Sequence, residues 1–465
     1  MSELSNDSKK MWGGRFGDST SHITEKISSS IQFDKVLYRQ DIRGSMAHAK
    51  MLNTIGVLTD DDYKNIIRGL ENIRHEIEEG TFKFSSSLED IHMNIESRLT
   101  EMIGDAGKRL HTGRSRNDQI ALDLRLFIID ACDEISILLK RLILALVNVA
   151  NREIDTVMPG YTHLQVAQPV RFSHHMLAHA WALIRDLRRL EFTMSSCDNL
   201  PLGSGAMAGV NYPSDREMLR NELNFSGIIP NSMDGVSDRD FALDFLYFAS
   251  MLGMHLSRFC EELVIWSSSE FAFIRLSDSV TTGSSIMPQK RNPDIAELIR
   301  GKTGRLYGDL ISLLTVMKSL PLTYNRDFQE DKEPVFDAVE TVMLSLEGMV
   351  EMITFMEVNT GRLKNAIYSN FSTATDLADY LVQKGVPFRQ SHEIIGNIVR
   401  YCENEKKDFF SLKLEDLKGF SENFESDVLD AINPETSTDR KVSYGSTSKE
   451  SVKNQIKMLR TILEG

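Results

Sequence analysis

The chain has 465 residues, 41% of them hydrophobic and 26% charged, a composition typical of a soluble globular protein with two or three domains. Its net charge of −14 argues against a general role in binding nucleic acids or membrane surfaces, because both require a basic face. The four cysteines form no Cys-x-x-Cys pair and no stretch has the apolar length of a membrane span, so we expect a reduced cytoplasmic protein without a metal or other cofactor.

Helical periodicity dominates the sequence. Apolar residues recur every three or four positions in four long segments, for which we predict helices. These segments are residues 118–149, 239–274, 293–319 and 334–356. Several are apolar on more than one side, which predicts burial against other helices or other subunits. Strand signals are sparse, with one short β segment expected near residues 228–230.

Shorter elements flank the long segments on both sides. We therefore predict an all-α fold with an N-terminal helical domain at residues 1–112, a central bundle of long helices at 113–362 and a C-terminal helical domain at 363–465. The second boundary follows from residues 357–362, after which a new set of shorter helices begins.

The first candidate site is a cluster of basic side chains just before the first long helix. Residues 108–116 contain Lys108, Arg109, His111, Arg114 and Arg116. A charge run is most often a solvated surface. Here the cluster adjoins a glycine and a run of polar residues at positions 117–119, which favours a site for an anionic ligand.

The second candidate is the loop of residues 160–169, which precedes a helix expected to begin near Pro169. It contains Thr162 and His163 among glutamines and a tyrosine. A lone histidine is more often structural, but a positioned imidazole is the commonest general acid or base.

The third candidate is the polar run from Gly283 to Asp294, which carries two serines, two cations and two carboxamides without an amphipathic period. Asn292 suits the N-cap of a helix and Pro293 its first position. A mobile loop anchored on a rigid helix is suited to close over an anionic substrate. Glu297, one turn into that helix, could hold His163, although an ordinary first-turn glutamate fits the sequence equally well.

Three further patterns are discounted. The glycine-rich run at residues 203–209 has the wrong spacing for a dinucleotide loop and follows no buried strand. His175 and His179 have helical i, i+4 spacing that could bind a metal, but no His-Glu-x-x-His pattern is present and packing is the better interpretation. Ser284 is not in a Gly-x-Ser-x-Gly elbow, which argues against an acyl-enzyme hydrolase.

These segments carry a resemblance to a known family. The Ser284 loop resembles the signature of the fumarase/aspartase superfamily, whose members eliminate fumarate from substituted succinates. Other segments resemble the argininosuccinate lyase family, which includes the delta-crystallins. These are Trp12–Phe16, His111–Gln119, Tyr161–Gln165, Leu200–Ala206 and Ala374–Leu381. The resemblance runs from about residue 11 to residue 390. Two departures, Val166 and Arg291, fall at positions without a catalytic role.

The resemblance implies a homotetramer whose active sites are shared between three subunits, and the cleavage of argininosuccinate to arginine and fumarate, the last step of arginine biosynthesis. It implies Ser284 and His163 as catalytic residues, with Glu297 paired to the histidine, and Lys290 and Asn292 facing the substrate carboxylates. The remaining residues expected at the substrate are Ser30, Arg114, Asn117, Thr162, Gln289, Tyr324, Gln329 and Lys332.

The chemistry of such an elimination suits these residues. Removal of a weakly acidic proton beside a carboxylate builds up negative charge, which requires preorganised donors and a cation. We expect Ser284 to remove the proton and His163 to protonate the leaving nitrogen, although the reverse assignment is equally compatible with the sequence. Another fumarate-releasing lyase, acting on adenylosuccinate or aspartate, and a crystallin-like structural protein are the alternatives.

Overall fold

The computed structural model describes residues 21–464, so the Trp12–Phe16 segment lies outside the described residues. Helices dominate, which confirms the all-α prediction. The strands of the described chain form two-stranded sheets, which pair β1 with β2, β3 with β4, β5 with β8 and β6 with β7. No helix among residues 21–464 is long and apolar enough to cross a membrane.

The chain divides into two compact units, each built from several stretches of sequence. Unit 1 contains the described part of residues 1–134 together with 189–250 and 304–341, and unit 2 contains 135–188, 251–303 and 342–464. The division into three consecutive domains remains a prediction. Five long helices have residues in both units, and they are α7 (Arg116–Arg152), α8 (Phe172–Cys197), α11 (Asp240–Ser267), α12 (Asp294–Met317) and α13 (Lys332–Thr354).

The long helices confirm four predicted segments, with two corrections at their ends. The segment predicted to continue to residue 274 ends as α11 at Ser267, after which the chain enters strand β5 (Ile274–Arg275). The helix expected to begin near Pro169 begins slightly later, as α8 at Phe172, because residues Gln165–Arg171 form strand β2. Hydrogen bonds to strand β1 (Val157–Thr162) hold residues 165–171 in a strand, although the residues that follow favour a helix.

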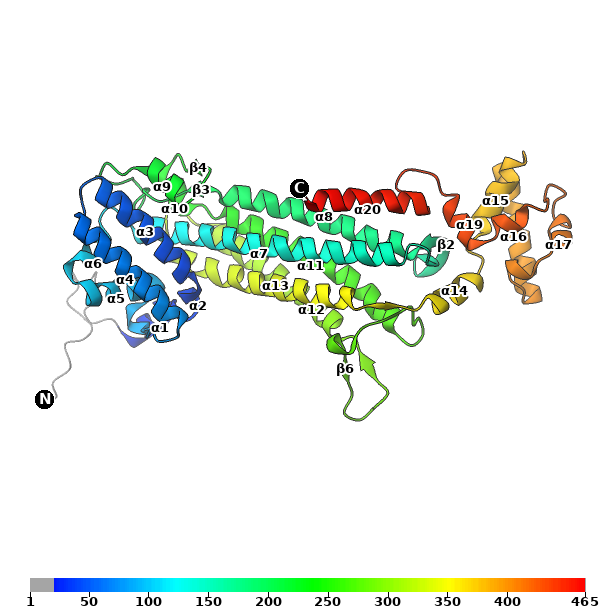
Figure 1. Cartoon of the computed structure of the whole chain (residues 1–465), viewed down its shortest axis with the longest axis horizontal. Coiled ribbons are helices and arrows are strands. Elements are labelled where there is room, and N and C mark those ends of the chain that lie inside the picture. The colour runs from blue at the N-terminus through cyan, green and yellow to red at the C-terminus, as the bar shows by residue number, and fades with distance from the viewer. Residues whose placement is uncertain (1–20, 465) are drawn as a thin grey trace. The chain divides into compact units, whose positions relative to one another are not determined.

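Unit 1 contains the shorter N-terminal elements, labelled from α1 in Figure 1, and they surround one apolar core. Leu52, Ile66, Leu70 and Leu99 from three of these helices are fully buried in it. Its α-helices are α1 (His22–Ser28), α2 (Ile31–Asp34), α3 (Tyr38–Thr54), α4 (Asp60–Glu78), α5 (Ile91–Ile103), α6 (Asp105–Arg109), α9 (Arg216–Glu222) and α10 (Ser232–Ser237). Its remaining elements are β3 (Asn199–Leu200), β4 (Gly227–Ile228) and 3₁₀ helices at Lys35–Leu37, Ser86–Leu88 and Arg326–Asp331. Strand β4 confirms the short β segment expected near residue 228.

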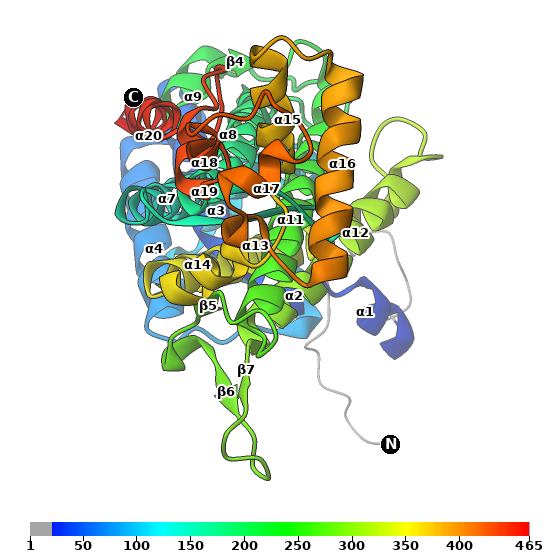
Figure 2. The ribbon, with the colours of Figure 1, turned by 90° about the vertical axis from the view of Figure 1, so that its right-hand side faces the viewer.

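Unit 2 contains the C-terminal helices, of which α15, α16 and α17 face the viewer in Figure 2. Leu381, Ile398, Phe409 and Phe424 are fully buried in its core. Its α-helices are α14 (Thr360–Tyr368), α15 (Ala374–Gln383), α16 (Phe388–Glu405), α17 (Leu414–Lys418), α18 (Val428–Ala431), α19 (Pro434–Asp439) and α20 (Lys449–Glu464). Its other elements are β6 (Thr282–Gly283), β7 (Arg291–Asn292), β8 (Glu357–Val358) and 3₁₀ helices at Asp278–Val280 and Phe409–Ser411.

Candidate active site

Five of the predicted substrate-binding residues line one cavity of about 150 Å³ in unit 1. They are Ser30, Asn117, Tyr324, Gln329 and Lys332. They come from segments that are far apart in the sequence and the fold brings them together, while their contact with substrate remains a prediction. The sequence analysis did not assign the other lining residues to the site, and these are Asp34, Glu89, Asp90, Arg116, Ile120 and Arg326. Of these residues, Arg116 belongs to the basic cluster found in the sequence, whereas the acidic residues belong to no sequence motif.

The wall of this cavity is held together by backbone and side-chain hydrogen bonds around Ser30. The Ser30 hydroxyl donates to Asp34 Oδ2 at 2.6 Å, and the Ser30 amide donates to the Glu89 carbonyl at 2.8 Å. From the opposite wall, Gln329 Nε2 donates to the Ser28 carbonyl at 3.0 Å. Arg326 donates to the same carbonyl at 2.8 Å and forms an ion pair with Glu89. The 3₁₀ helix Arg326–Asp331 is therefore attached to the last residue of α1.

Lys332 is oriented by a buried carboxylate. Its Nζ lies 2.8 Å from Asp331 Oδ1, while Arg239 Nε donates to Asp331 Oδ2 at 2.5 Å. All three side chains are almost completely buried. Burial alone would raise the pKa of Asp331, but the charges of Lys332 and Arg239 outweigh it and hold that pKa below its usual value. The site lysine is thus part of a buried network in which two cations share one carboxylate.

Asn117 stands at the start of α7, where the side chains of Ser115 and Asp118 both accept backbone N–H groups. The Asn117 amide donates to Ser115 Oγ at 3.2 Å, and the Ser115 amide donates to Asp118 Oδ1 at 2.9 Å. The other carboxylate oxygen of Asp118 accepts the backbone N–H groups of Gly203 and Gly205 at 3.1 and 2.8 Å. The glycine-rich run therefore binds a protein carboxylate here and supports the site, in agreement with its rejection as a dinucleotide loop.

Ser284 lies at the base of the loop that joins β6 to β7, and Figure 2 shows this hairpin carrying its loop at the tip. The Ser284 Oγ accepts the backbone N–H groups of Ile286 and Met287 at 3.4 and 3.2 Å. Ser284 is half-buried, whereas residues 285–290, with Gln289 and Lys290 among them, are exposed. The loop thus presents a serine oxygen already facing two amide donors.

The hairpin corrects the expected start of the following helix. Asn292 pairs with Thr282 in the sheet instead of capping the helix. Helix α12 begins at Asp294, and the Pro293 carbonyl accepts the Glu297 amide at 3.1 Å. The Thr282 hydroxyl donates to the Asp294 carboxylate, so the hairpin is attached to the first turn of the helix.

His163 occupies a tight turn between β1 and β2. Thr162 pairs with Gln165, so His163 and Leu164 are the two turn residues, with φ values of 55° and 56°. Two consecutive left-handed residues are the geometry of a type I′ hairpin, which normally selects glycine or asparagine. Such backbone strain is concentrated at functional sites. The turn holds Thr162 and His163 exposed.

The expected pairing of His163 with Glu297 is not formed within one chain. Among residues 21–464 no hydrogen bond or ion pair joins the side chains of His163, Ser284 and Glu297. Glu297 is exposed on the first turn of α12. One chain therefore presents these three groups separately, each accessible for contact with another molecule.

Comparison with known proteins decides the family. A model of the lyase family matches residues 14–308, and a model of the argininosuccinate lyase C-terminal region matches residues 371–439. The chain is 56% identical over 451 residues to an argininosuccinate lyase of Geotalea daltonii, covering 97% of this chain and 98% of that relative. It is 53% identical over 448 residues to one of Geobacter sulfurreducens, with coverage of 96% and 98%. The chain belongs to the argininosuccinate lyase family.

A solved structure of an EDDS lyase in complex with formate has the same fold. The TM-score is 0.85 at 26% sequence identity, with 95% of this chain and 89% of that chain covered.

The C-terminal match to the argininosuccinate lyase family includes Asp376, which accepts from the Ser437 hydroxyl at 2.8 Å and from Lys441 Nζ at 2.5 Å. The Ala374–Leu381 motif therefore contributes a buried structural carboxylate.

Arg114, predicted to bind substrate, lies outside the lining of the unit 1 cavity. Its Nη1 donates to Ser45 Oγ at 2.9 Å. Burial lowers its pKa, and the charge of Asp41 opposes that effect. Asp41 Oδ1 also lies 2.9 Å from His92 Nδ1, and Asp123 Oδ2 lies 3.4 Å from the same nitrogen. In this argininosuccinate lyase family member the arginine belongs to a buried charge network.

Within this network we predict opposite responses to neutralising the two aspartates. Burial raises the pKa of Asp123 well above its usual value, and the nearby Asp41 carboxylate adds to the effect. Burial also opposes ionisation of Asp41, but His92 and Arg114 outweigh it and lower the pKa of Asp41. Asp123→Asn should therefore leave the free energy of unfolding at pH 7 unchanged or raise it, because an amide has no proton for the unfolded chain to release, whereas Asp41→Asn should lower it by about 1–3 kcal/mol. Urea unfolding of both variants measures this difference.

The pH dependence gives the sign of each contribution. The stability from Asp41 is present above its unfolded pKa and is lost as the pH falls through its lowered folded pKa. The contribution of Asp123 depends on pH in the opposite sense. Its carboxyl keeps its proton on folding, so stability decreases as the pH rises toward its raised folded pKa. Equal losses of stability at pH 7 in Asp41→Asn and Asp123→Asn would contradict this assignment.

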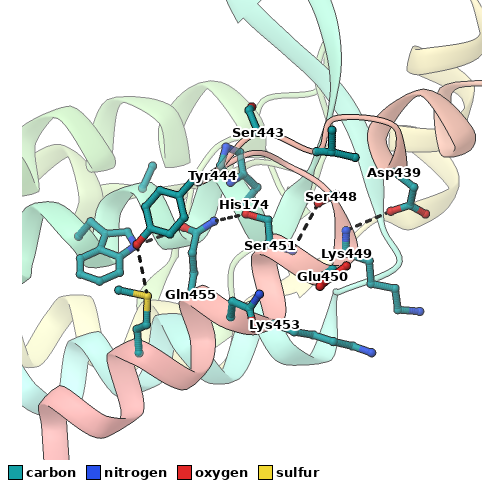
Figure 3. Close-up of a pocket in the computed structure, with 16 residues that line it drawn as sticks. His174, Asp439, Ser443, Tyr444, Ser448, Lys449, Glu450, Ser451, Lys453 and Gln455 are labelled. Atoms are coloured by element: carbon teal, nitrogen blue, oxygen red, sulfur yellow. Dashed lines mark hydrogen bonds between the residues drawn. The ribbon is translucent and has the colours of Figure 1, made fainter.

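A larger cavity of about 1100 Å³ lies in unit 2 between α8, α20 and residues 439–451 (Figure 3). Trp181 Nε1 donates to Gln455 Oε1 at 3.2 Å on its wall, and His174 also lines it. None of the predicted catalytic or substrate-binding residues is among its lining residues. Size alone therefore does not identify the active site of an argininosuccinate lyase family member.

Proposed function

We propose that the protein cleaves argininosuccinate reversibly into L-arginine and fumarate, the last step of arginine biosynthesis. A proton leaves the succinyl carbon next to the carboxylate, the carbon–nitrogen bond breaks, and its electron pair passes to the departing guanidino nitrogen as the double bond of fumarate forms. Family membership supports the reaction. The observation that carries the mechanism is the pair of backbone N–H groups on Ser284 Oγ.

Ser284 is the proposed base. A serine hydroxyl is a poor base unless its alkoxide is stabilised. The amides of Ile286 and Met287 already face Oγ at 3.4 and 3.2 Å, so they stabilise negative charge there without reorganising. Lys290 is exposed on the same loop and supplies the cation.

The carboxylate beside the reacting carbon acquires a second negative charge in the intermediate. Lys290, Gln289 and Asn292 are the donors proposed to face it, together with Thr162 from the β1–β2 turn. One preorganised donor to such an oxyanion lowers the activation free energy by roughly 3 kcal/mol. The exposure of the hairpin loop lets these donors close over the succinyl end only after it has bound.

His163 is the proposed acid for the leaving nitrogen, with Glu297 holding its protonated form. The β1–β2 turn fixes the imidazole at an exposed strained position. The exchange of roles between His163 and Ser284 remains the alternative, and pH profiles of the two single variants distinguish the assignments.

The unit 1 cavity is the proposed site for the arginine end of the substrate. That end carries an α-carboxylate and an α-ammonium group. The cavity offers both signs of charge, from the acids Asp34 and Asp90 and from the cations Arg116 and Lys332. The cavity also contains neutral hydrogen-bonding groups, which belong to Asn117, Tyr324 and Gln329.

We further propose a homotetramer in which several chains complete each site. Helix α12 exposes large apolar side chains on one face, with Tyr307 46%, Ile311 61% and Leu314 44% exposed. Gly304 and Gly308, on the same helix, have open space where a side chain would stand. Exposed apolar helix faces of this kind mark subunit interfaces. The separation of His163, Ser284 and Glu297 in one chain fits sites completed by neighbours, in a cytoplasmic enzyme without a cofactor.

Two measurements test this function. The purified protein is incubated with argininosuccinate, adenylosuccinate and aspartate while the absorbance of fumarate is followed. A rise with argininosuccinate alone supports the proposal, whereas a rise with another substrate identifies a different lyase, and no rise with any of them identifies a crystallin-like protein.

The shared site is tested separately by mixing chains. A Ser284→Ala chain and a His163→Ala chain, each inactive alone, are unfolded and refolded together. Recovery of part of the wild-type activity supports sites that draw the two residues from different chains. A stable monomer with full activity by sedimentation would overturn the tetramer.

A further inference from the structure

Two histidines and a glutamate, none of them assigned to the elimination, converge in unit 2. His175 and His179 lie on consecutive turns of α8, and Glu262 lies on α11. Both imidazole Nε2 atoms are 2.7 Å from the same carboxylate oxygen, Glu262 Oε2. The three possible ligand atoms lie within 4.8 Å of one another. The histidine spacing was visible in the sequence, but the glutamate is 83 residues beyond His179 and could not be assigned to it.

This arrangement has the ligand types and spacing of a three-residue transition-metal site. A tetrahedral zinc-type ion has bonds of about 2.0–2.2 Å to histidine nitrogen and carboxylate oxygen, which places its ligand atoms about 3.3 Å apart. The present 2.7 Å separations between nitrogen and oxygen need to widen by several tenths of an ångström. Small rotations about the side-chain bonds of His175, His179 and Glu262 provide that movement, and each neutral imidazole would bind the ion through the Nε2 lone pair while carrying its proton on Nδ1.

Aromatic neighbours hold both imidazoles in place. The Trp266 ring meets His175 edge to face with centroids 4.8 Å apart, and the Phe259 ring stacks on His179 at 4.1 Å. Such packing restricts the rings to the orientation in which both Nε2 atoms face α11. Preorganised ligands lose little conformational entropy when the ion binds.

The cluster is open on one side. The exposed fractions of the side chains are 27% for His175, 17% for His179 and 35% for Glu262. A metal held by three protein ligands keeps a fourth position for water, and partial exposure supplies both the entry path and that water. The positive charge of Arg258, which also acts on His179, opposes binding and limits the affinity.

We propose that His175, His179 and Glu262 bind one divalent zinc-type transition-metal ion per chain, with water as the fourth ligand. The ion links α8 to α11 within unit 2 and stabilises the folded chain by mass action. None of the three residues belongs to the groups assigned to proton transfer or substrate binding, so turnover does not require the ion. The competing interpretation is a glutamate that accepts two hydrogen bonds and binds no metal.

The test uses the untagged, full-length protein after removal of metals. Titration with Zn²⁺ in a calorimeter should give one site per chain with a dissociation constant below about 10 µM, and Zn²⁺ should raise the midpoint of thermal unfolding. Co²⁺ in the same site should show the visible absorption of a tetrahedral complex. Binding weaker than about 100 µM, or the absence of a saturable site, would overturn the proposal.

Variants connect that binding to the three residues. His175→Gln and Glu262→Gln should each weaken Zn²⁺ binding at least about 100-fold while fumarate release stays close to wild type, which shows that the variants fold. His174→Gln changes the adjacent histidine, which faces the large cavity instead of the cluster, and should bind as wild type does. Unchanged binding in His175→Gln and Glu262→Gln, or an equal loss in His174→Gln, would place the ion elsewhere.

Discussion

Replacing Ser284 with alanine should lower kcat for fumarate release by a factor of about 10² to 10⁴, the range found for removal of a positioned base or oxyanion donor. The Ser284 Oγ is the atom on which the Ile286 and Met287 amides converge, and a methyl group can neither accept these N–H groups nor take a proton. The KM for argininosuccinate should change much less, because the proposed contacts to the arginine end lie in the unit 1 cavity. Steady-state kinetics that follow fumarate absorbance measure both parameters.

Ser285→Ala is the matched control for this variant. Ser285 is exposed in the same loop and one residue along, so its loss should leave kcat within about threefold of wild type. Near-normal turnover in Ser284→Ala would remove the serine from the mechanism. Equal losses in both variants would instead indicate that the loop was disturbed as a whole.

The helical fold was predictable because it depends on local patterns. Apolar periodicity located α7, α12 and α13 to within a few residues, since such a stripe is required to bury one face of each helix. Where prediction failed, tertiary pairing overrode local preference. Residues 165–171 became a strand because β1 offers a hydrogen-bonding partner, and the apolar pattern after Ser267 continued into β5.

The candidate site was predictable only where residue types form a motif. Ser284, His163 and Asn117 stand in recognisable segments, and Asn117 lines the unit 1 cavity. Asp34 and Glu89 carried no such signal, because an isolated acid in a helical sequence is normally a surface residue. They reach the cavity only because Ser30 and the Glu89 backbone fold against each other. Side-chain orientation of this kind depends on contacts that are distant in sequence.

Replacing Asp331 with alanine should lower the free energy of unfolding by about 3–5 kcal/mol at pH 7, the cost of leaving buried charges without their partner. Arg239 and Lys332 both bond to this carboxylate, and neither side chain is more than 3% exposed. The freed Lys332 ammonium should also raise the KM for argininosuccinate, since it lines the proposed arginine site. Urea unfolding followed by circular dichroism measures the stability change.

The neighbouring Asp327→Ala variant is the control, because Asp327 is exposed in the same 3₁₀ helix and should cost less than about 0.5 kcal/mol. Adding Arg239→Met to Asp331→Leu should recover part of the loss, because apolar residues of similar volume replace one of the buried charges and its partner. Comparable destabilisation in Asp327→Ala and Asp331→Ala would contradict the assignment.

The pH dependence separates lost charge pairing from lost packing at Asp331. Burial raises the pKa of this carboxyl, but Lys332 and Arg239 outweigh it and the folded pKa lies below the usual value. Its stabilising contribution is therefore complete above the unfolded pKa of about 3.9 and is lost as the pH falls through the lower folded pKa. The difference in stability between wild type and Asp331→Ala should shrink over that acidic range. A difference that stays constant with pH would mean that the carboxylate contributes by filling space, and that Lys332 is oriented by other contacts.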